Sequence, residues 1–207
     1  MKSGRALKLA DVPPYEALLD AVERFWSDYK RGRFKWFKRE VEDFTALKDV
    51  ALFAVLVFTG CRLGEALALT REDVDPKRRV VRVRQLKKKA KEFVRTVPVP
   101  SPLFWEVMER YLSRTATDRL FTITDRGARD VVYRIAECYL KRRLRPHAIR
   151  HSYAIAVLKA TRNLEAVRRL LGHEDYDTVK VYLDLSQEDL EEELAKVFER
   201  ARRDLVS

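Results

Sequence analysis

The 207-residue sequence has no long apolar run. Its longest candidate, Val50 to Phe58, has about half of the roughly 18 apolar residues that a membrane-spanning helix needs. The N-terminus, M-K-S-G-R-A-L-K-L-A-D-V-P-P, contains basic residues but lacks the uninterrupted apolar stretch of a signal peptide. We therefore expect a soluble, cytoplasmic protein.

Cysteines and side-chain amides are also scarce. The two cysteines, Cys61 and Cys138, provide neither a disulfide framework nor the ligand spacing of a zinc site, so we expect both to be reduced and buried. Asn163, Gln85 and Gln187 are the only amides, whereas 36% of the residues are charged. This bias is typical of proteins from hot environments, which is a hypothesis about the source organism.

Basic and apolar residues are abundant. The hydrophobic fraction of 46% favours a globular protein, because that much apolar surface offsets the entropy lost when the chain orders. The 43 Lys and Arg residues against 32 Asp and Glu give a formal net charge of +11. Such a charge favours a polyanionic partner, nucleic acid before membrane, since basic groups displace counterions from phosphates. Composition does not distinguish DNA from RNA.

Hydrophobic periodicity predicts an α+β fold that is mostly α-helical. After a flexible leader (1–13), a single domain (14–207) is expected. Period-two alternation in 80–87 and 93–99 predicts an antiparallel β-hairpin or a small three-stranded sheet, and 120–123 are a candidate for one more short strand. Gly172 has the position of a left-handed helix C-cap. Helices are expected at 15–29, 41–58, 101–115, 126–142, 146–160, 163–171, 175–183 and 186–205.

The segment K-R-G-R-F-K-W-F-K, residues 30–38, interleaves cations with aromatic side chains. Two interpretations remain open for it. Either Arg33 and Lys35 contact phosphates beside aromatic anchors, or the segment is a solvated turn whose aromatics join the core.

Arginines embedded in apolar segments are the first sign of chemistry. Arg62 follows a buried helix and Arg150 lies within H-A-I-R-H-S-Y-A-I-A. A guanidinium stays protonated and can bind two phosphate oxygens at once, so the pair indicates a dianion or a pentavalent phosphate. His147 and Arg150 are spaced i,i+3 and share a helix face. Metal ligation by the three histidines lacks a supporting carboxylate or cysteine cluster.

Spaced sequence boxes resemble those of the tyrosine recombinases, the phage integrase and Xer type. T-G-C-R-L-G-E resembles the first-arginine box, with Arg62 and Glu65, and H-A-I-R-H-S resembles the H-x-x-R-H box, with His147 and Arg150. L-G-H resembles the next box. The resemblance covers roughly 14–205 and implies that catalytic domain's fold, with His173 in the third box and, nine residues later, Tyr182 as the nucleophile.

The resemblance also implies a catalytic lysine on the hairpin, and we assign Lys87. Lys88, Lys89 and Lys91 are interpreted as tip charges that touch DNA phosphates non-specifically. Relatives usually carry a separate N-terminal core-binding domain, whereas about 40 residues precede the central helix here. No such domain is therefore expected in this chain, either because it is an excised catalytic domain or because it is a natural short form.

The implied reaction is attack of Tyr182 on a DNA phosphodiester. A phenol with a pKa of about 10 is a poor nucleophile, but nearby guanidinium groups favour the phenolate. The products implied by the resemblance are a 3′-phosphotyrosine ester and a 5′-hydroxyl. Neither a metal nor a nucleotide cofactor is required, because the ester preserves the bond energy. Four residues assist, with Arg62, Arg150 and His173 on the non-bridging oxygens and Lys87 protonating the leaving oxygen.

The remaining polar and aromatic residues near the boxes receive supporting roles. His147 would assist proton transfer at the tyrosine, and Glu65 would orient its neighbours. His151 is interpreted as structural, and Tyr153 and Tyr176 as packing aromatics. Tyr176 lies six residues before Tyr182, about one and two-thirds helical turns, so the two phenols point to different faces.

The last predicted helix, 186–205, has an apolar stripe. It either packs on its own domain or docks on a neighbouring protomer in a DNA-bound tetramer. The leading function is therefore a site-specific recombinase of double-stranded DNA at the nucleoid, with integration, excision and dimer resolution undecided. A topoisomerase-like relaxer and a catalytically silent DNA-binding regulator are alternatives, whereas a helical RNA-binding protein accounts for the charge but not for the boxes.

Overall fold

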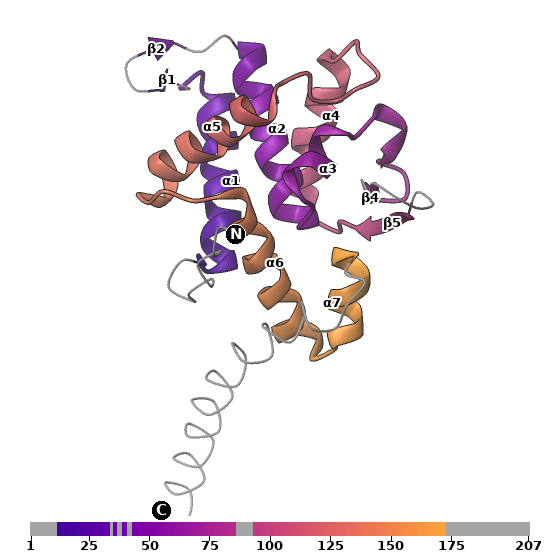
Figure 1. Cartoon of the computed structure of the whole chain (residues 1–207). Coiled ribbons are helices and arrows are strands. Elements are labelled where there is room, and N and C mark those ends of the chain that lie inside the picture. The colour runs from indigo at the N-terminus through magenta and orange to yellow at the C-terminus, as the bar shows by residue number, and fades with distance from the viewer. Residues whose placement is uncertain (1–11, 34, 37–38, 41–42, 86–92, 173–207) are drawn as a thin grey trace, which may run out of the picture. The chain divides into compact units, whose positions relative to one another are not determined.

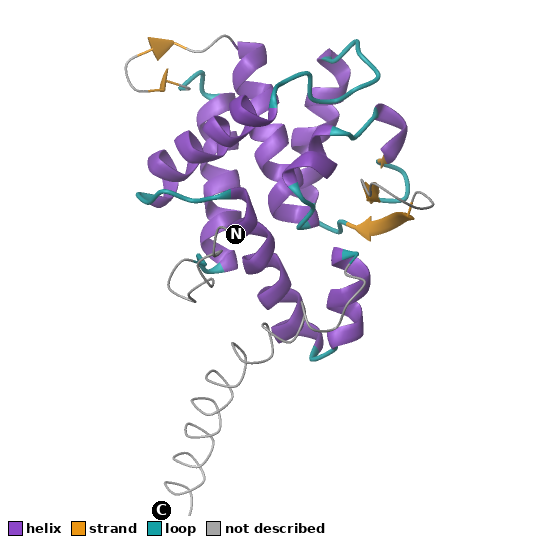
Figure 2. Cartoon of the chain, in the orientation of Figure 1, coloured by secondary structure: helices purple, strands orange, loops and turns teal. Residues whose placement is uncertain are grey.

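The computed structural model describes residues 12–33, 35–36, 39–40, 43–85 and 93–172, and Figure 1 shows the chain. The described residues fall into two compact units, one ending at Tyr153 and the other beginning at Ala154. The predicted class is confirmed, because the fold is mostly helical with a three-stranded antiparallel sheet (Figure 2). None of the helices in these ranges combines the length and the apolar character that a bilayer span requires.

Helix α2 (Asp43–Thr59) forms the centre of the first unit, where the sequence predicted a buried helix. It packs against α1 (Tyr15–Lys30), α4 (Pro102–Arg114) and α5 (Asp125–Ile135). All side chains from Val50 to Val57 are at most 1% exposed. Each large apolar side chain buried in this way stabilises the fold by about 1.5–3 kcal/mol, so α2 fixes the positions of its neighbours.

The sheet forms from the predicted hairpin and one additional short strand. Strand β4 (Val80–Gln85) pairs with β5 (Phe93–Pro98), and β3 (Val74–Asp75) adds to the other edge of β4. Val81, Val83, Arg95 and Val97 are buried on one face, with Val83 opposite Arg95 and Val81 opposite Val97. An arginine therefore occupies a core-facing position of this sheet.

The remaining elements of the first unit are short. They are β1 (Lys35–Trp36), β2 (Arg39–Glu40), α3 (Leu63–Leu67), the 3₁₀ turn η2 (Arg71–Asp73) and the π-helical segment η3 (Ala136–Leu140). The pairing of β1 with β2 was not predicted. The helix predicted at 126–142 is α5 followed by η3, and it ends at Lys141 in the left-handed conformation.

The strand proposed for residues 120–123 was wrong. Leu120 donates its N–H to the carbonyl of Leu69 at 3.0 Å and accepts a hydrogen bond from the Tyr111 hydroxyl. Only an isolated bridge joins Thr70 to Arg119. The buried backbone groups are therefore satisfied one at a time by a loop and a side chain, which removes the need for a strand partner.

The division between the two units falls within α6 (Pro146–Thr161). The second unit continues into α7 (Leu164–Leu171), whose N-cap Asn163 accepts a hydrogen bond from the backbone N–H of Ala166 at 3.1 Å. Gly172 ends α7 with φ of 65°, so the predicted left-handed C-cap is confirmed.

Candidate active site

A sharp turn at Gly60 carries the chain from the central helix into the site. The Thr59 hydroxyl donates to the Val55 carbonyl at 2.7 Å, and Gly60 then adopts φ of 58°. A Cβ atom at Gly60 would lie 2.4 Å from the ring of Tyr153, closer than real Cβ contacts come. Both the backbone angle and this close approach require glycine. The turn places Arg62 directly before α3.

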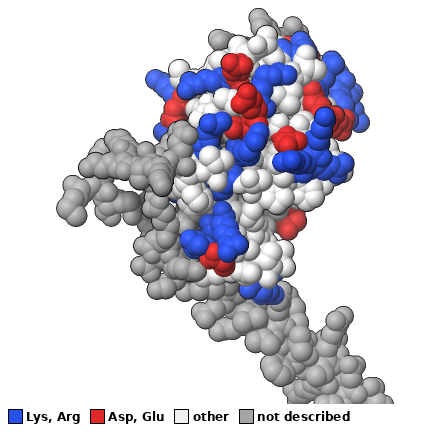
Figure 3. All heavy atoms as spheres, turned by 90° about the vertical axis from the view of Figure 1, so that its right-hand side faces the viewer, with Lys and Arg blue, Asp and Glu red and all other residues white. Residues whose placement is uncertain are grey.

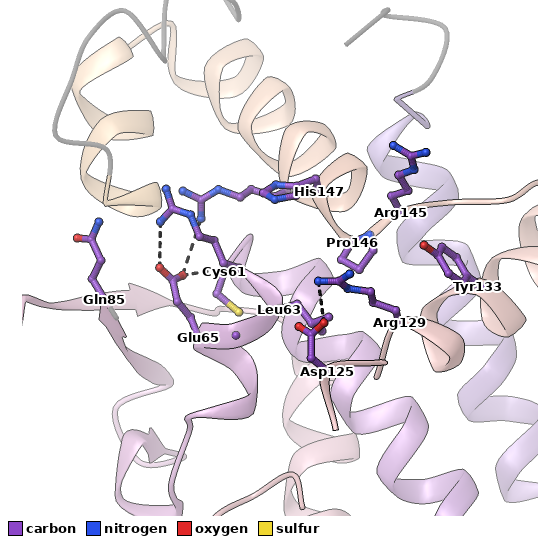
Figure 4. A pocket seen from close by; sticks show the side chains of 13 residues that line it. Cys61, Leu63, Glu65, Gln85, Asp125, Arg129, Tyr133, Arg145, Pro146 and His147 are labelled. Carbon is purple, nitrogen blue, oxygen red and sulfur yellow. Dashed lines mark hydrogen bonds and ion pairs between the residues drawn. The ribbon is translucent and has the colours of Figure 1, made fainter. Parts of the chain in front are cut away.

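Glu65 of α3 binds the positive groups of the site, and dashed lines in Figure 4 mark its interactions with the partners that line the pocket. Its Oε1 accepts from Arg62 Nη1 at 3.0 Å, and its Oε2 accepts from the Arg62 backbone N–H at 2.9 Å. Arg95 Nη2 donates to Oε2 at 2.6 Å, and Arg150 Nη1 lies 4.0 Å from the same oxygen. Arg150 also donates to the Gly60 carbonyl at 2.8 Å. We call these four side chains, Arg62, Glu65, Arg95 and Arg150, the Glu65 cluster.

The electrostatics of this cluster favour an ionised carboxylate. Burial acts to raise the pKa of Glu65, but the hydrogen bond and charge of Arg95 oppose it, together with the Arg62 N–H and the charge of Arg150. These groups outweigh burial and hold the pKa of Glu65 below its ordinary value. One carboxylate then faces three guanidinium groups, which leaves a surplus of positive charge for an anion.

Exposure differs sharply within the cluster. The side chains of Arg95 and Arg150 are 3% and 4% exposed, whereas that of Arg62 is 39% exposed. Arg62 is therefore the member most open to an incoming ligand. Arg150 is held against the Gly60 carbonyl and presents a fixed guanidinium.

His147 joins the same pocket from the first turn of α6, as the i,i+3 spacing to Arg150 predicted. Burial lowers the pKa of His147, and the charges of Arg150, Arg62 and Arg129 lower it further. His151 follows one turn later, with ring centroids 6.3 Å apart. Burial, then His147 and Arg150, lower the pKa of His151 to about 4. Both imidazoles are therefore neutral near pH 7, and a neutral imidazole can accept a proton.

The pocket has a volume of about 660 Å³ and extends beyond the Glu65 cluster along α5 (Figure 4). Asp125, Arg129 and Tyr133 are spaced i, i+4 and i+8, so they form one stripe of that helix. Arg129 is paired with Asp125 at 2.7 Å. The full lining is Cys61, Arg62, Leu63, Gly64, Glu65, Gln85, Asp125, Arg129, Tyr133, Arg145, Pro146, His147 and Arg150.

Cys61 and Tyr153 have packing roles. Burial raises the pKa of the free Cys61 thiol to about 11, so it remains protonated. Tyr153 is 7% exposed, contacts Tyr15 edge-on at 6.0 Å and covers Gly60, which confirms the packing role predicted for it. Cys138 is also free, but it is partly exposed rather than buried, so that part of the prediction was wrong. In the described ranges, no group of three or more His, Cys, Asp or Glu side chains is arranged to hold a metal ion.

Of the residues assigned from the sequence, Arg62, Glu65, His147 and Arg150 lie together in this pocket. Arg33 is exposed after α1 and does not line the pocket, and Lys35 belongs to β1. Seven further assignments and the last predicted helix lie outside the described residues: Lys87, Lys88, Lys89, Lys91, His173, Tyr176, Tyr182 and 186–205.

Sequence reasoning missed Arg95, and with it the α5 stripe and Arg145. A signal for Arg95 was present, because in a strand it is in phase with Val97, two residues later, and so belongs to the buried face. The stripe on α5 carried no such signal, since Asp125, Arg129 and Tyr133 are ordinary residues for an exposed helix face.

The chain belongs to the phage integrase family, whose model matches residues 37–189. Among its relatives, the tyrosine recombinase XerA of Saccharolobus solfataricus is 31% identical over 153 residues, which are 72% of this chain and 50% of that protein. XerC of Azotobacter vinelandii is 31% identical over 173 residues, 78% of this chain and 56% of the relative. The chain thus spans about half the length of the curated relatives it matches.

Solved structures support the same fold. The XerH site-specific recombinase bound to palindromic difH substrate, in a post-cleavage complex, matches with a TM-score of 0.71 at 22% identity, over 91% of this chain and 53% of that one. The crystal structure of XerA recombinase matches with a TM-score of 0.67 at 20% identity, over 94% of this chain and 66% of that one. The catalytic-domain fold implied by the sequence boxes is therefore confirmed.

Proposed function

We propose that this chain is a tyrosine-type DNA strand transferase that recombines double-stranded DNA at specific sites. The observation that carries the proposal is the Glu65 cluster, which holds Arg62 and Arg150 in one pocket with His147. Two fixed guanidinium groups with surplus positive charge match the two non-bridging oxygens of a phosphodiester. A neutral imidazole beside them can accept a proton.

The proposed reaction begins with attack of the Tyr182 oxygen on the phosphorus. The bond from phosphorus to the 5′ oxygen breaks, a 3′-phosphotyrosine ester forms, and the 5′ oxygen leaves with a proton from Lys87. A 5′-hydroxyl of another strand then attacks the ester and releases Tyr182. One phosphate ester replaces another at each step, so the bond energy is retained and no cofactor is consumed.

The cluster supplies charge stabilisation in this scheme. Negative charge builds on the non-bridging oxygens as the phosphorus becomes pentavalent, and Arg62, Arg150 and His173 would bind those oxygens. His147 would accept the phenol proton, since its lowered pKa keeps the imidazole unprotonated near pH 7. Glu65 contacts no substrate in the proposal and instead orients the arginines.

Double-stranded DNA is the proposed partner. On the face in Figure 3, Lys and Arg cover more surface than Asp and Glu. Lys77, Arg78 and Arg79 are exposed in the turn between β3 and β4. We propose that Lys88, Lys89, Lys91, Arg33 and Lys35 add phosphate contacts.

In the proposed assembly, residues 14–207 form the catalytic domain and follow a short leader. The helix predicted at 186–205 docks on a neighbouring protomer, and four copies act together on DNA at the nucleoid. Docking in trans would couple the active sites of the tetramer.

The test is formation of a covalent protein–DNA adduct. The full chain is incubated with a pool of labelled duplexes of randomised sequence, each with one nick, so that the short cleaved fragment diffuses away and the adduct is trapped. We expect an SDS-resistant adduct for the wild type and for Tyr176→Phe, and none for Tyr182→Phe. Duplex binding without any adduct would contradict the proposal and indicate a silent DNA-binding protein.

A further inference from the structure

We propose that Arg95 is a positioning residue of the strand-transfer reaction, because it fixes the carboxylate of Glu65 in the orientation that holds Arg62 and Arg150. This inference rests on the proposed function and deepens it. Nothing in the sequence boxes points to Arg95, since it belongs to the returning strand of the hairpin rather than to a box.

Arg95 reaches Glu65 from the buried face of the β3–β4–β5 sheet. Arg95 lies opposite Val83 in the register of β4 and β5, and its side chain is 3% exposed. A buried guanidinium is stabilised only when charged or polar groups compensate its lost hydration. Glu65 provides that compensation, at 2.6 Å from Arg95 Nη2. This distance is shorter than those from Glu65 to Arg62 Nη1 and to Arg150 Nη1, which are 3.0 Å and 4.0 Å.

Glu65 lies in the five-residue helix α3, and its carboxylate is oriented by the donors around it. Oε2 of Glu65 is shared between Arg95 and the Arg62 backbone N–H, which leaves Oε1 directed at Arg62 Nη1. Glu65 is 3% exposed, so bulk water has poor access to replace a lost donor. Without Arg95, the carboxylate is expected to turn toward its remaining arginines.

Rotation of the Glu65 carboxylate would affect the reaction by displacing the guanidinium of Arg62. Arg62 is 39% exposed, and a guanidinium that loses a fixed carboxylate partner at such a position samples orientations in solvent. Misplacement of a phosphate-binding group by about 1 Å can reduce a rate by about 100-fold. Arg95 therefore acts on the reaction through Glu65 and without contact to the substrate.

The variants are Arg95→Met, which keeps the aliphatic length, and Arg95→Lys, which keeps the charge but not the planar fork. Arg84→Met is the matched control. Arg84 lies on the neighbouring strand β4 and pairs with the buried carboxylate of Asp73 at 3.0 Å, but it does not line the pocket. Each protein is first checked for folding by circular dichroism and thermal melting.

Single-turnover adduct formation on the nicked duplex pool should fall about 100-fold in Arg95→Met and about 10-fold in Arg95→Lys, with the Kd for the same DNA changed less than about threefold. Arg84→Met should retain the wild-type rate. The pKa of Glu65 should rise in Arg95→Met, because Arg95 is its strongest lowering influence, and a ¹³C NMR titration of the side-chain carboxylate measures the change.

The double variant Arg95→Met/Glu65→Gln tests whether Arg95 affects the reaction through Glu65 or independently of it. If Arg95 works through Glu65, the double variant is no slower than Glu65→Gln alone, whereas additive losses would overturn the inference. A folded Arg95→Met protein with the wild-type rate would also overturn it, as would an equal loss in Arg84→Met.

A measurement without DNA separates this inference from the proposed function. In ¹⁵N spectra of arginine side chains, Arg95→Met should broaden or shift the Arg62 guanidinium signal, and Arg84→Met should leave it unchanged. If the wild type forms no adduct, the proposed function fails. The positioning of Arg62 by Arg95 is then judged on the spectrum alone, where an unchanged Arg62 signal contradicts it.

Discussion

Asp49 in α2 and Glu65 in α3 are both buried carboxylates, 1% and 3% exposed, but their pKa values move in opposite directions. Burial raises the pKa of Asp49 to about 6, and the charges of Lys48 and Arg134 only partly oppose this. The pKa of Glu65 is held below its ordinary value although burial acts on it in the same way. Burial alone therefore does not decide the charge state of a carboxyl group in this fold.

The difference lies in the number and distance of donors. Asp49 has Arg134 Nη2 at 3.5 Å from Oδ2, and its Oδ1 has no hydrogen-bond partner among the described residues. Glu65 has donors on both oxygens, including Arg95 at 2.6 Å and the Arg62 N–H at 2.9 Å. A carboxylate that accepts several charged hydrogen bonds stays ionised in the interior, whereas one with a single distant partner favours protonation. Glu65, the carboxylate with more donors, is the one that lines the pocket.

The largest expected effect comes from removing the charge of Glu65. Glu65→Gln leaves the buried guanidinium groups of Arg95 and Arg150 without their carboxylate, which typically costs 3–5 kcal/mol when one partner of a buried pair is removed. We expect the free energy of unfolding at pH 7 to fall by about 3 kcal/mol, measured by urea denaturation. Adduct formation should fall at least about 100-fold. A Glu65→Gln protein as stable as the wild type would contradict the role of the cluster.

The opposite result is expected for Asp49. Its folded-state pKa lies above its ordinary value, so the buried charge costs stability above about pH 6 and the cost disappears as the pH falls toward 4. Asp49→Asn removes that charge while keeping the shape, and should raise the free energy of unfolding by about 1–2 kcal/mol at pH 8. The gain should vanish near pH 4. Urea denaturation across this range measures it, and a loss of stability at pH 8 would show that the Arg134 pair outweighs burial.

A smaller effect is expected on the pKa of His147, which depends on the charges of Arg62 and Arg150 in the Glu65 cluster. Its pKa is lowered, so its imidazole should titrate below pH 6.5 in an NMR titration of the ring protons. In Glu65→Gln the positive surplus grows by one charge, and the midpoint should move further down. In Asp49→Asn it should stay in place, because Asp49 pairs with Arg134, which does not shift His147, whereas Glu65 pairs with Arg62 and Arg150, which do. An upward movement in Glu65→Gln would refute the proposed net charge.

The smallest effect is expected at Cys61, where burial acts without a strong opposing donor. With a pKa of about 11 and 2% exposure, the thiol should resist alkylation by iodoacetamide at pH 8 in the folded protein. Cys138 is partly exposed and should be labelled first. Mass spectrometry after timed quenching gives the order, and faster labelling of Cys61 would indicate an opening of the pocket.

Much of the fold and three of the four residues of the Glu65 cluster followed from the sequence. The helices α1, α2, α4, α6 and α7 were predicted within two residues at each end, because apolar spacing and capping residues act locally. Arg62, Glu65 and Arg150 were found through their boxes. Arg95 belongs to no box and was missed, although its phase with Val97 indicated the buried face of the strand. Arg82 alternates with Val81 and Val83 and is exposed, whereas Arg95 is buried.

The wrong strand prediction at residues 120–123 also arose from contacts between residues that are distant in sequence. The apolar run 120–123 has the composition of a strand, but a strand requires a partner edge. The tertiary fold provides a hydroxyl from Tyr111 and a loop carbonyl from Leu69 instead. The opposite charge behaviour of Asp49 and Glu65 also depends on donors that are distant in sequence, such as Arg134 and Arg95.

The contact between Gly60 and Tyr153 links two positions 93 residues apart in the chain. The ring of Tyr153 occupies the volume that any side chain at position 60 would need, and the backbone there favours glycine in addition. The two positions are therefore expected to covary across the family. Relatives with asparagine or another residue at position 60 should carry a side chain smaller than tyrosine at position 153, while those that keep the tyrosine should keep the glycine.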